Sequence, residues 1–462
     1  MSQGVTVASE DAGHGSSARL AFLAIAVTSL GLAVQDNGGN LSPTAILWLT
    51  LSLAAGWGAL WARAETRSRW PWAVASLCVL TQFAVLAVDP LIGTMSMEAF
   101  KGYAATVAVA AVLAGALCTA SAKSRPWLFL LLACVAAFLG CWLLRKLPFP
   151  GIDVLMFQQQ SWQTLLHGVN PYTIHFPDPY PPASSARFYG PGVSVNGVLQ
   201  FGYPYMPLTL LMALPGYLLG DVRYASLAAM ILSAILIALA RPSRGSFLAA
   251  TLLLFTPAFP LMLFCGWTES YVLLLVATAW FCQCRAPRLV PYVIGLLLVS
   301  KQYMIIGAPV ILLLVPRPWS MRALWGFIWR AGLAGAAVTL PLVLWEPRAF
   351  LHSAVWLQFR QPLRWDALSY LVWAEPKNPT KWMGLPFAGA AIAWLVVMAA
   401  GRRRKVPFAL ALALTMAAFF ALNKQAFANY YYLVIGMLCV AAAGVAEDEA
   451  VPVEPAIGNA SA

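Results

Sequence analysis

The segment GIDVLMFQQQSWQTLLHGVNPY, residues 151–172, places one carboxylate directly after a long apolar run at 126–144. This acid, Asp153, is followed by a stretch rich in glutamine and leucine and then by a turn of Gly168, Asn170 and Pro171. Asp is favoured at helix starts, so the pattern predicts a helix over 154–167 with Asp153 as its N-cap. The same position suits a general base at a membrane surface, and the two roles are compatible.

The composition predicts an all-α, polytopic membrane helix bundle. The chain has 462 residues, of which 61% are hydrophobic and 10% charged, whereas soluble domains carry about 25% charged residues. A membrane helix needs roughly 20 mostly apolar residues, and about fourteen runs approach that length. The runs are 20–35, 43–62, 71–88, 102–121, 126–144, 223–240, 246–264, 269–284, 289–300, 303–315, 326–345, 384–400, 406–422 and 430–445.

Positive charge follows an alternating topology when the N-terminus is placed in the cytoplasm. The cytoplasmic connections then contain one acid, Glu65, against many basic residues. These are Arg63, Arg67, Arg69, Lys123, Arg125, Arg241, Arg244, Arg285, Arg288, Arg317, Arg322, Arg330, Arg402, Arg403, Arg404 and Lys405. The positive-inside rule therefore predicts a multi-pass protein with both termini cytoplasmic, and it explains the net charge of +12 without nucleic acid.

Three polar connections fall outside in this topology, at 146–206, 346–383 and 423–429. In the first of them, the helix over 154–167 is expected to lie in the interface, 178–192 to be irregular, and 207–220 to dip without crossing. Two short runs meet at Lys301, which at that depth needs an ionic partner or a wet cavity. The tails at 1–17 and 446–462 are expected to be disordered, and the functional face to be extracytoplasmic.

Several short motifs resemble one family of membrane enzymes. DVLMFQQQSWQTLLHGVNPY, then YPP and GYPYMPL, and later SKQ (300–302) and NKQAFANYYY (423–432), are similar to the GT-C glycosyltransferases. The nearest branch contains the mycobacterial phosphatidylinositol-mannoside mannosyltransferases. The motifs extend over roughly 145–440 in the expected order, each short alone but specific together.

The resemblance implies an inverting transfer, on the outer face of a bacterial plasma membrane, from a polyprenyl-phosphate sugar to a glycolipid or cell-envelope glycan. Asp153 matches the first-loop acid that takes the acceptor proton, and His352 matches a late-loop histidine found in part of the family. The family acid usually follows the first membrane helix, whereas here it follows the fifth run. Residues 18–125 are therefore expected to form an additional four-helix module before a catalytic domain at 126–445.

Further site residues follow from the chemistry of a departing lipid phosphate and of a sugar. Negative charge builds on the phosphate as the bond breaks, so cationic and polar groups are expected there. The donor-phosphate candidates are Lys301, Gln302, Arg360, Arg364 and Lys424. The substrate-binding candidates are Gln159, Asn170, Tyr172, Tyr203, Tyr205, Glu269 and Tyr430.

Each of these residues also has a plainer interpretation. Arg364 and Asp366 can pair locally, and Arg360 can meet lipid headgroups. Glu269 can be a helix-start acid facing the dipole, and the tyrosines can be interfacial anchors.

Other chemistries find less support in the sequence. The outer loops hold no D-x-D and no close carboxylate pair, so no divalent metal or other cofactor is required. A Gly-rich phosphate loop is also missing, which argues against direct use of a nucleotide sugar. Two rivals remain open: a lipid-linked-sugar flippase or transporter, which should contain inverted repeats, and a non-catalytic scaffold, for which Asp153 would be dispensable.

Overall fold

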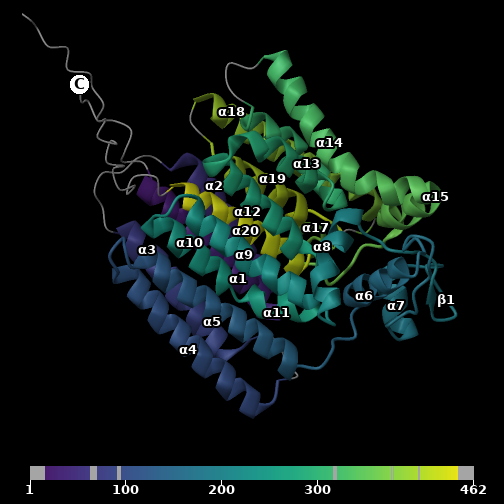
Figure 1. Ribbon diagram of the computed structural model, residues 1–462, viewed down its shortest axis with the longest axis horizontal. Helices are drawn as coiled ribbons and strands as arrows, with labels where there is room; N and C mark the ends of the chain where they lie inside the picture. The colour runs from purple at the N-terminus through teal and green to yellow at the C-terminus, as the bar shows by residue number, and fades with distance from the viewer. Residues whose placement is uncertain are drawn as a thin grey trace, which may run out of the picture.

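The computed structural model describes residues 16–62, 70–90, 95–315, 320–375, 377, 379–403 and 406–445. Almost every ordered element within these ranges is helical (Figure 1). The longer helices are α1 (Ser16–Asn37), α2 (Pro43–Trp61), α3 (Trp70–Val88), α4 (Met97–Thr119), α5 (Arg125–Lys146), α9 (Arg223–Ala240), α12 (Glu269–Arg285), α14 (Met321–Trp345), α18 (Leu385–Arg403) and α20 (Ala428–Val445). The expected all-α membrane bundle is thus confirmed, and the expected disorder at 1–15 and 446–462 lies outside the described residues.

Helix length and hydropathy identify the candidate membrane spans. Among the described residues, eight helices are long and apolar enough to cross a membrane, or nine with one bent pair. Of the other five predicted runs, 269–284 appears as α12, 384–400 as α18 and the remaining three as shorter helices, and the count of about fourteen stays a prediction. The shorter apolar helices are α8 (Pro207–Leu218), α10 (Arg244–Leu254), α11 (Ala258–Cys265), α13 (Val290–Leu298), the 3-10 helix η2 (Gln302–Leu313) and α19 (Phe408–Ala421), and the dipping of α8 stays a prediction.

Two of the apolar segments are broken. Helices α10 and α11 meet at a bend of 54°, next to Pro257. Helices α13 and η2, the first preceded by the short η1 (Pro287–Leu289), flank an extended residue, Lys301, with φ −149° and ψ 145°. The predicted break at 300–303 is therefore present, and broken helices of this kind are tolerated where protein surrounds them.

The centre of the bundle is built by small residues that let helices approach closely. Helix α1 packs against α2 and against the last helix, α20. A Cβ at Gly436 of α20 would lie 2.2 Å from Leu273 Cδ1 of α12, and one at Gly140 of α5 would lie 2.4 Å from Leu227 Cδ1 of α9. Small residues drive such packing in membranes, where burial of apolar surface contributes little. Of the first four predicted spans, α1 thus lies against the last helix of the bundle.

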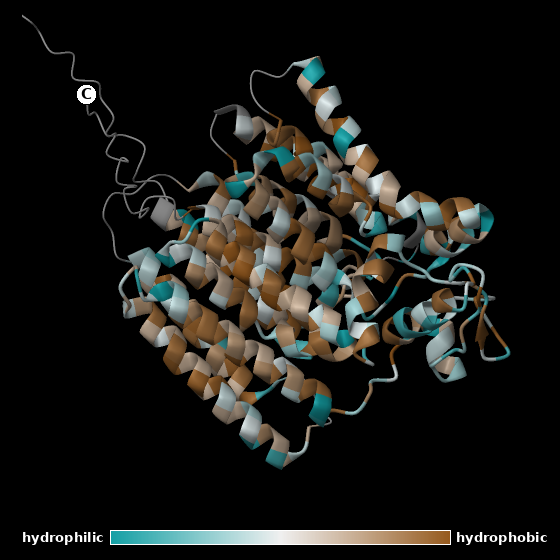
Figure 2. Ribbon diagram, viewed as in Figure 1, coloured by the Kyte–Doolittle hydropathy of each residue, from teal (hydrophilic) through white to brown (hydrophobic). Residues whose placement is uncertain are grey.

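The long connections 146–206 and 346–383 gather at one end of the bundle, where Figure 1 places α6, α7, β1 and α15, and where Figure 2 shows more hydrophilic residues. A second hydrophobic core lies here, built largely from Phe157, Phe176, Phe201 and Phe350. The elements are α6 (Asp153–Leu166), α7 (Pro182–Tyr189), the antiparallel pair β1 (Ser194–Val195) and β2 (Val198–Leu199), α15 (Pro347–Phe350), the π-helical η3 (Leu351–Trp356), α16 (Leu357–Arg360), α17 (Tyr370–Trp373) and η4 (Pro379–Trp382).

One expectation for this end is wrong. The stretch 178–192 was expected to be irregular, yet it contains the eight-residue helix α7. Two prolines start the helix, where a missing N–H costs nothing, and Gly190 ends it with φ +83°. Proline and glycine here mark the two ends of a helix.

Candidate active site

Asp153 opens α6, and both of its carboxylate oxygens have partners. Oδ1 accepts the N–H of Val154 at 2.7 Å, and Oδ2 accepts the hydroxyl of Tyr189 at 2.7 Å. The backbone N–H of Asp153 donates to Tyr180 Oη at 3.3 Å. Ile152 rather than Asp153 is the N-cap, but the Asp153 side chain still accepts a first-turn amide. The carboxylate is therefore held in one orientation while remaining partly exposed.

The surroundings of Asp153 make its carboxylate more basic than usual. Burial raises its pKa, while the hydrogen bonds from Tyr189 and Val154 and the positive charge of Arg364 lower it, with a net upward shift. A carboxylate of raised pKa accepts a proton more readily once it is ionised. The same negative charge and burial raise the pKa of Tyr189, which therefore stays a hydrogen-bond donor.

Three consecutive residues of α7 make contacts around the site: two reach the connection 346–383, and the third reaches Asp153. Arg187 lies 3.3 Å from Asp366, the Phe188 ring lies 4.1 Å from the Arg364 guanidinium, and Tyr189 donates to Asp153. This arrangement was not predicted from the sequence, because 178–192 was expected to be irregular. The start and stop signals of α7, Pro182 and Gly190, were the available evidence for it.

Arg364 and Asp366 form the local pair that was one of the two interpretations of this stretch. Arg364 Nε and Nη2 donate to the two Asp366 oxygens at 2.9 and 2.8 Å. Burial acts to raise the pKa of Asp366, but Arg364 outweighs it and, with Arg187, holds the pKa below its usual value. Arg364 is therefore partly neutralised, although its charge still reaches Asp153.

Lys301 has the ionic partner that its depth requires. Its Nζ lies 2.9 Å from Glu269 Oε1 and 2.5 Å from Thr268 Oγ1, and it sits 4.2 Å from the centroid of the Tyr205 ring. Tyr303 also donates to Glu269 Oε1, at 3.1 Å. Glu269 is fully buried, and within the described ranges its Oε2 has no hydrogen-bond partner. Lys301 is thus neutralised by Glu269 and is not a free cation.

Gln302 and Lys424 use their donors to hold backbone together. Gln302 Nε2 donates to the carbonyls of Pro204 and Ala354 at 2.8 and 2.9 Å. Lys424 Nζ donates to the carbonyls of Gln361 and Gln358 at 2.6 and 3.2 Å. Burial lowers the pKa of Lys424. These contacts bring the three connections 146–206, 346–383 and 423–429 into one cluster.

Asn170, Tyr172 and Tyr203 are buried, and their polar groups are bound within the protein. Asn170 Nδ2 donates to the Leu342 carbonyl at 3.1 Å, and Tyr172 donates to the Tyr205 carbonyl at 2.8 Å. The Tyr203 hydroxyl lies 3.1 Å from that of Thr209. These contacts form the framework of the loop, and a substrate role for the three residues stays a prediction.

The other predicted residues lie at varying distances from this framework. The ring centroids of Tyr430 and Tyr303 are 5.6 Å apart, and Tyr430 lies within electrostatic range of Glu269. Gln159 Nε2 lies 3.5 Å from the Gly220 carbonyl. His352 and Arg360 are exposed, and no side-chain hydrogen bond or ion pair holds either of them in the described part of the chain. His352 is therefore not brought to Asp153 by any contact seen here.

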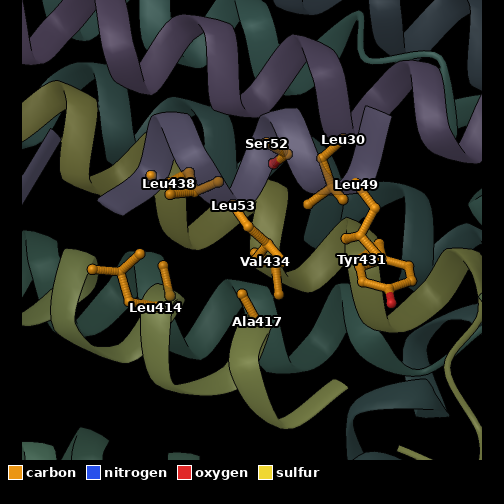
Figure 3. Close-up of a pocket in the computed structure, with 11 residues that line it drawn as sticks. Leu30, Leu49, Ser52, Leu53, Leu414, Ala417, Tyr431, Val434 and Leu438 are labelled. Carbon is orange, nitrogen blue, oxygen red and sulfur yellow. The ribbon is translucent and has the colours of Figure 1, made fainter. Parts of the chain in front are cut away.

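An apolar crevice elsewhere in the bundle is too small for a sugar. It lies among α1, α2, α19 and α20, lined by residues such as Leu49, Leu414 and Val434 (Figure 3). The crevice has a volume of about 10 Å³, which is about enough for one water molecule. The polar cluster around Asp153 and Glu269 is the better candidate for chemistry.

That cluster combines a basic carboxylate, a buried ion pair and several tyrosines at one end of the bundle. Within the described ranges, no three His, Cys, Asp or Glu side chains lie close enough together to hold a metal ion. Comparisons with protein-family models, curated proteins and solved structures find no match for this chain.

Proposed function

We propose that the chain is an inverting membrane glycosyltransferase with Asp153 as its general base. The sugar moves from a polyprenyl phosphate to a hydroxyl of a glycolipid or cell-envelope glycan. The observation that carries the proposal is the Asp153 carboxylate itself: partly exposed, oriented by Tyr189 and Val154, and of raised pKa. By its motif, it matches the first-loop acid of the family that the sequence resembles, although here it follows the fifth apolar run.

The positions of the predicted cytoplasmic connections support an extracytoplasmic location for this site. Arg223, at the start of α9, is packed near Leu155 of α6 through Gly266. Helix α9 has 18 residues, so its other end lies about 27 Å away. There Arg285 donates to the Ala240 carbonyl at 2.8 Å, which brings two of the predicted cytoplasmic connections together. We place the Asp153 end outside the plasma membrane and both termini in the cytoplasm.

The sugar is proposed to lie against the tyrosines around Glu269. Tyr205, Tyr303 and Tyr430 are all partly exposed. Tyr205 and Tyr430 interact electrostatically with the Glu269 carboxylate. Aromatic faces pack against sugar rings, and the buried Glu269–Lys301 pair holds two of these rings in place: Tyr303 donates to Glu269, and Lys301 lies over the Tyr205 ring. Because Lys301 is already paired with Glu269, the donor phosphate is assigned mainly to the exposed Arg360, and secondly to the partly neutralised Arg364.

Purified protein in lipid, given one radiolabelled polyprenyl-phosphate sugar at a time, tests the activity through release of polyprenyl phosphate. A positioned general base contributes about 10²–10⁴-fold, so Asp153→Asn should lose that factor while staying folded. Glu98→Gln, which changes an exposed acid of α4, is the matched control and should keep full activity. Full activity in Asp153→Asn would remove Asp153 as the base.

The phosphate assignment has its own test. Arg360→Gln should raise the donor KM about tenfold, because one charge-assisted hydrogen bond is worth about 1.5–3 kcal/mol. Arg348→Gln, an exposed arginine on α15, is the control. An unchanged KM would move the phosphate site away from Arg360.

A lipid-linked-sugar flippase or transporter remains the second candidate, because the buried Lys301–Glu269 pair lies beside broken helices, as in many transport pathways. Vesicles separate the two functions. Movement of labelled lipid across the bilayer without release of polyprenyl phosphate would favour the transporter.

A further inference from the structure

The bend between α10 and α11 leaves main-chain carbonyls without helical donors. Pro257 has no N–H, and α10 ends at Leu254. A bilayer supplies no water to such carbonyls, so other protein groups must satisfy them.

Gln82 of α3 supplies the missing donor. Its side chain is fully buried and faces the Leu252 and Phe255 carbonyls. With the amide oriented so that its nitrogen faces these two acceptors, it donates to them at 2.9 and 3.2 Å. The other end of the amide lies 3.5 Å from Thr28 Oγ1 of α1. Helix α1 also packs directly on the bend, because a Cβ at Gly31 would lie 3.0 Å from Pro257 Cδ. Two helices of the predicted N-terminal module thus hold the bend.

The far end of α11 contacts the helix that carries Asp153. Gly266 ends α11 in the left-handed region, with φ +62°. Gln158 of α6 donates its amide to the Gly266 carbonyl at 2.8 Å and to the Val154 carbonyl at 3.2 Å. A Cβ at Gly266 would lie 3.0 Å from Leu155 Cδ1. One rigid segment therefore connects the bend to the first turn of α6.

We infer that Gln82 is a positioning residue: by holding the bent α10–α11 segment, it orients Gly266 and through it α6 with Asp153. This assigns a role to the N-terminal helices. The inference rests on contacts alone and holds whatever reaction Asp153 performs, so its test measures backbone protection.

Hydrogen–deuterium exchange of the full chain in lipid nanodiscs tests the inference. Gln82→Leu leaves two buried carbonyls unsatisfied, so exchange in α11 and α6 should accelerate about tenfold. Exchange in α14 should not change. Thr81→Val is the control, because it removes only an exposed bond to the Leu77 carbonyl of the same helix. Equal acceleration everywhere, or none in α6, would overturn the inference.

Cutting the other end of the connection gives an independent test. Gln158→Leu should accelerate exchange in α6 but not in α11, and adding Gln82→Leu should then affect α11 alone. Gln82→Glu, whose protonated carboxyl still donates one hydrogen bond, should restore part of the protection. Additive effects on α6 in the double variant, or release of α11 by Gln158→Leu, would contradict the inference.

Discussion

Replacing Tyr189 with phenylalanine tests the basicity of Asp153. The hydroxyl of Tyr189 donates to Asp153 Oδ2 at 2.7 Å, a normal length for an O–H···O bond. The bond stabilises the ionised carboxylate, so its loss should raise the pKa of Asp153 further. Hydrogen bonds to charged groups are worth about 1.5–3 kcal/mol, and one pKa unit corresponds to about 1.36 kcal/mol. The expected upward shift is therefore about 1–2 units.

The shift should appear in the pH dependence of activity. Asp153 accepts a proton only when ionised, so the acidic limb of the kcat/KM profile should move to higher pH in Tyr189→Phe. Above the new pKa the rate should recover, because the carboxylate itself is still present and more basic. Infrared difference spectra against Asp153→Asn measure the same ionisation without turnover.

Tyr271→Phe is the matched control for this experiment. It removes another buried tyrosine hydroxyl, which lies 3.4 Å from the Val222 carbonyl and does not contact Asp153. Its acidic limb should coincide with that of the unchanged protein. An unmoved limb in Tyr189→Phe, with the infrared shift present, would refute Asp153 as the base. An unmoved infrared band would refute the hydrogen bond.

Three further predictions concern stability, measured by thermal melts in lipid. Asp153→Asn should match the unchanged protein at acidic pH and become the more stable of the two as pH rises through the raised pKa of Asp153, because burial disfavours only the ionised form. Asp366→Asn should do the opposite. The lowered pKa of Asp366 stabilises the fold at pH values above the usual pKa of an aspartate, so the variant should be less stable at pH 7 by about 1 kcal/mol and equally stable at low pH. A flat difference across pH would contradict either one. Glu269→Gln should cost about 3–5 kcal/mol by leaving Lys301 buried without its partner, and Glu269→Gln with Lys301→Met should recover most of it; equal losses in both would mean that the pair is not what holds this region.

The fold class could be predicted from the sequence because it depends on local composition. Long apolar runs with few charges specify membrane helices, and the boundaries of α6 agree with the prediction to within one residue. The number of spans could not be settled in this way. Runs such as 303–315 are apolar enough for the membrane but fold as a 3-10 helix of 12 residues, and only packing decides whether such a segment crosses.

The candidate site was predictable only in part. Lys301 was expected to need a partner because of its depth, and Glu269 was singled out separately, yet 32 residues separate them in sequence. Their pairing depends on how α12 packs against the α13–η2 break. Tyr189 was missed altogether, because its contact with Asp153 requires the short helix α7, whose proline-rich sequence was interpreted as irregular.

Gly266 contacts the helix that carries Asp153 and precedes Glu269 by three residues, so its conformation affects the placement of both acids. Its carbonyl is bound by Gln158, one turn from Asp153 on α6. Three residues after it, Glu269 opens α12 and binds Lys301. The left-handed conformation at Gly266, together with the lack of room for a Cβ there, ties the start of α6 and the start of α12 to one corner of the backbone. The proposed base and the carboxylate that supports the proposed sugar site are thus set by a single turn, and we infer that the bend held by Gln82 orients that turn.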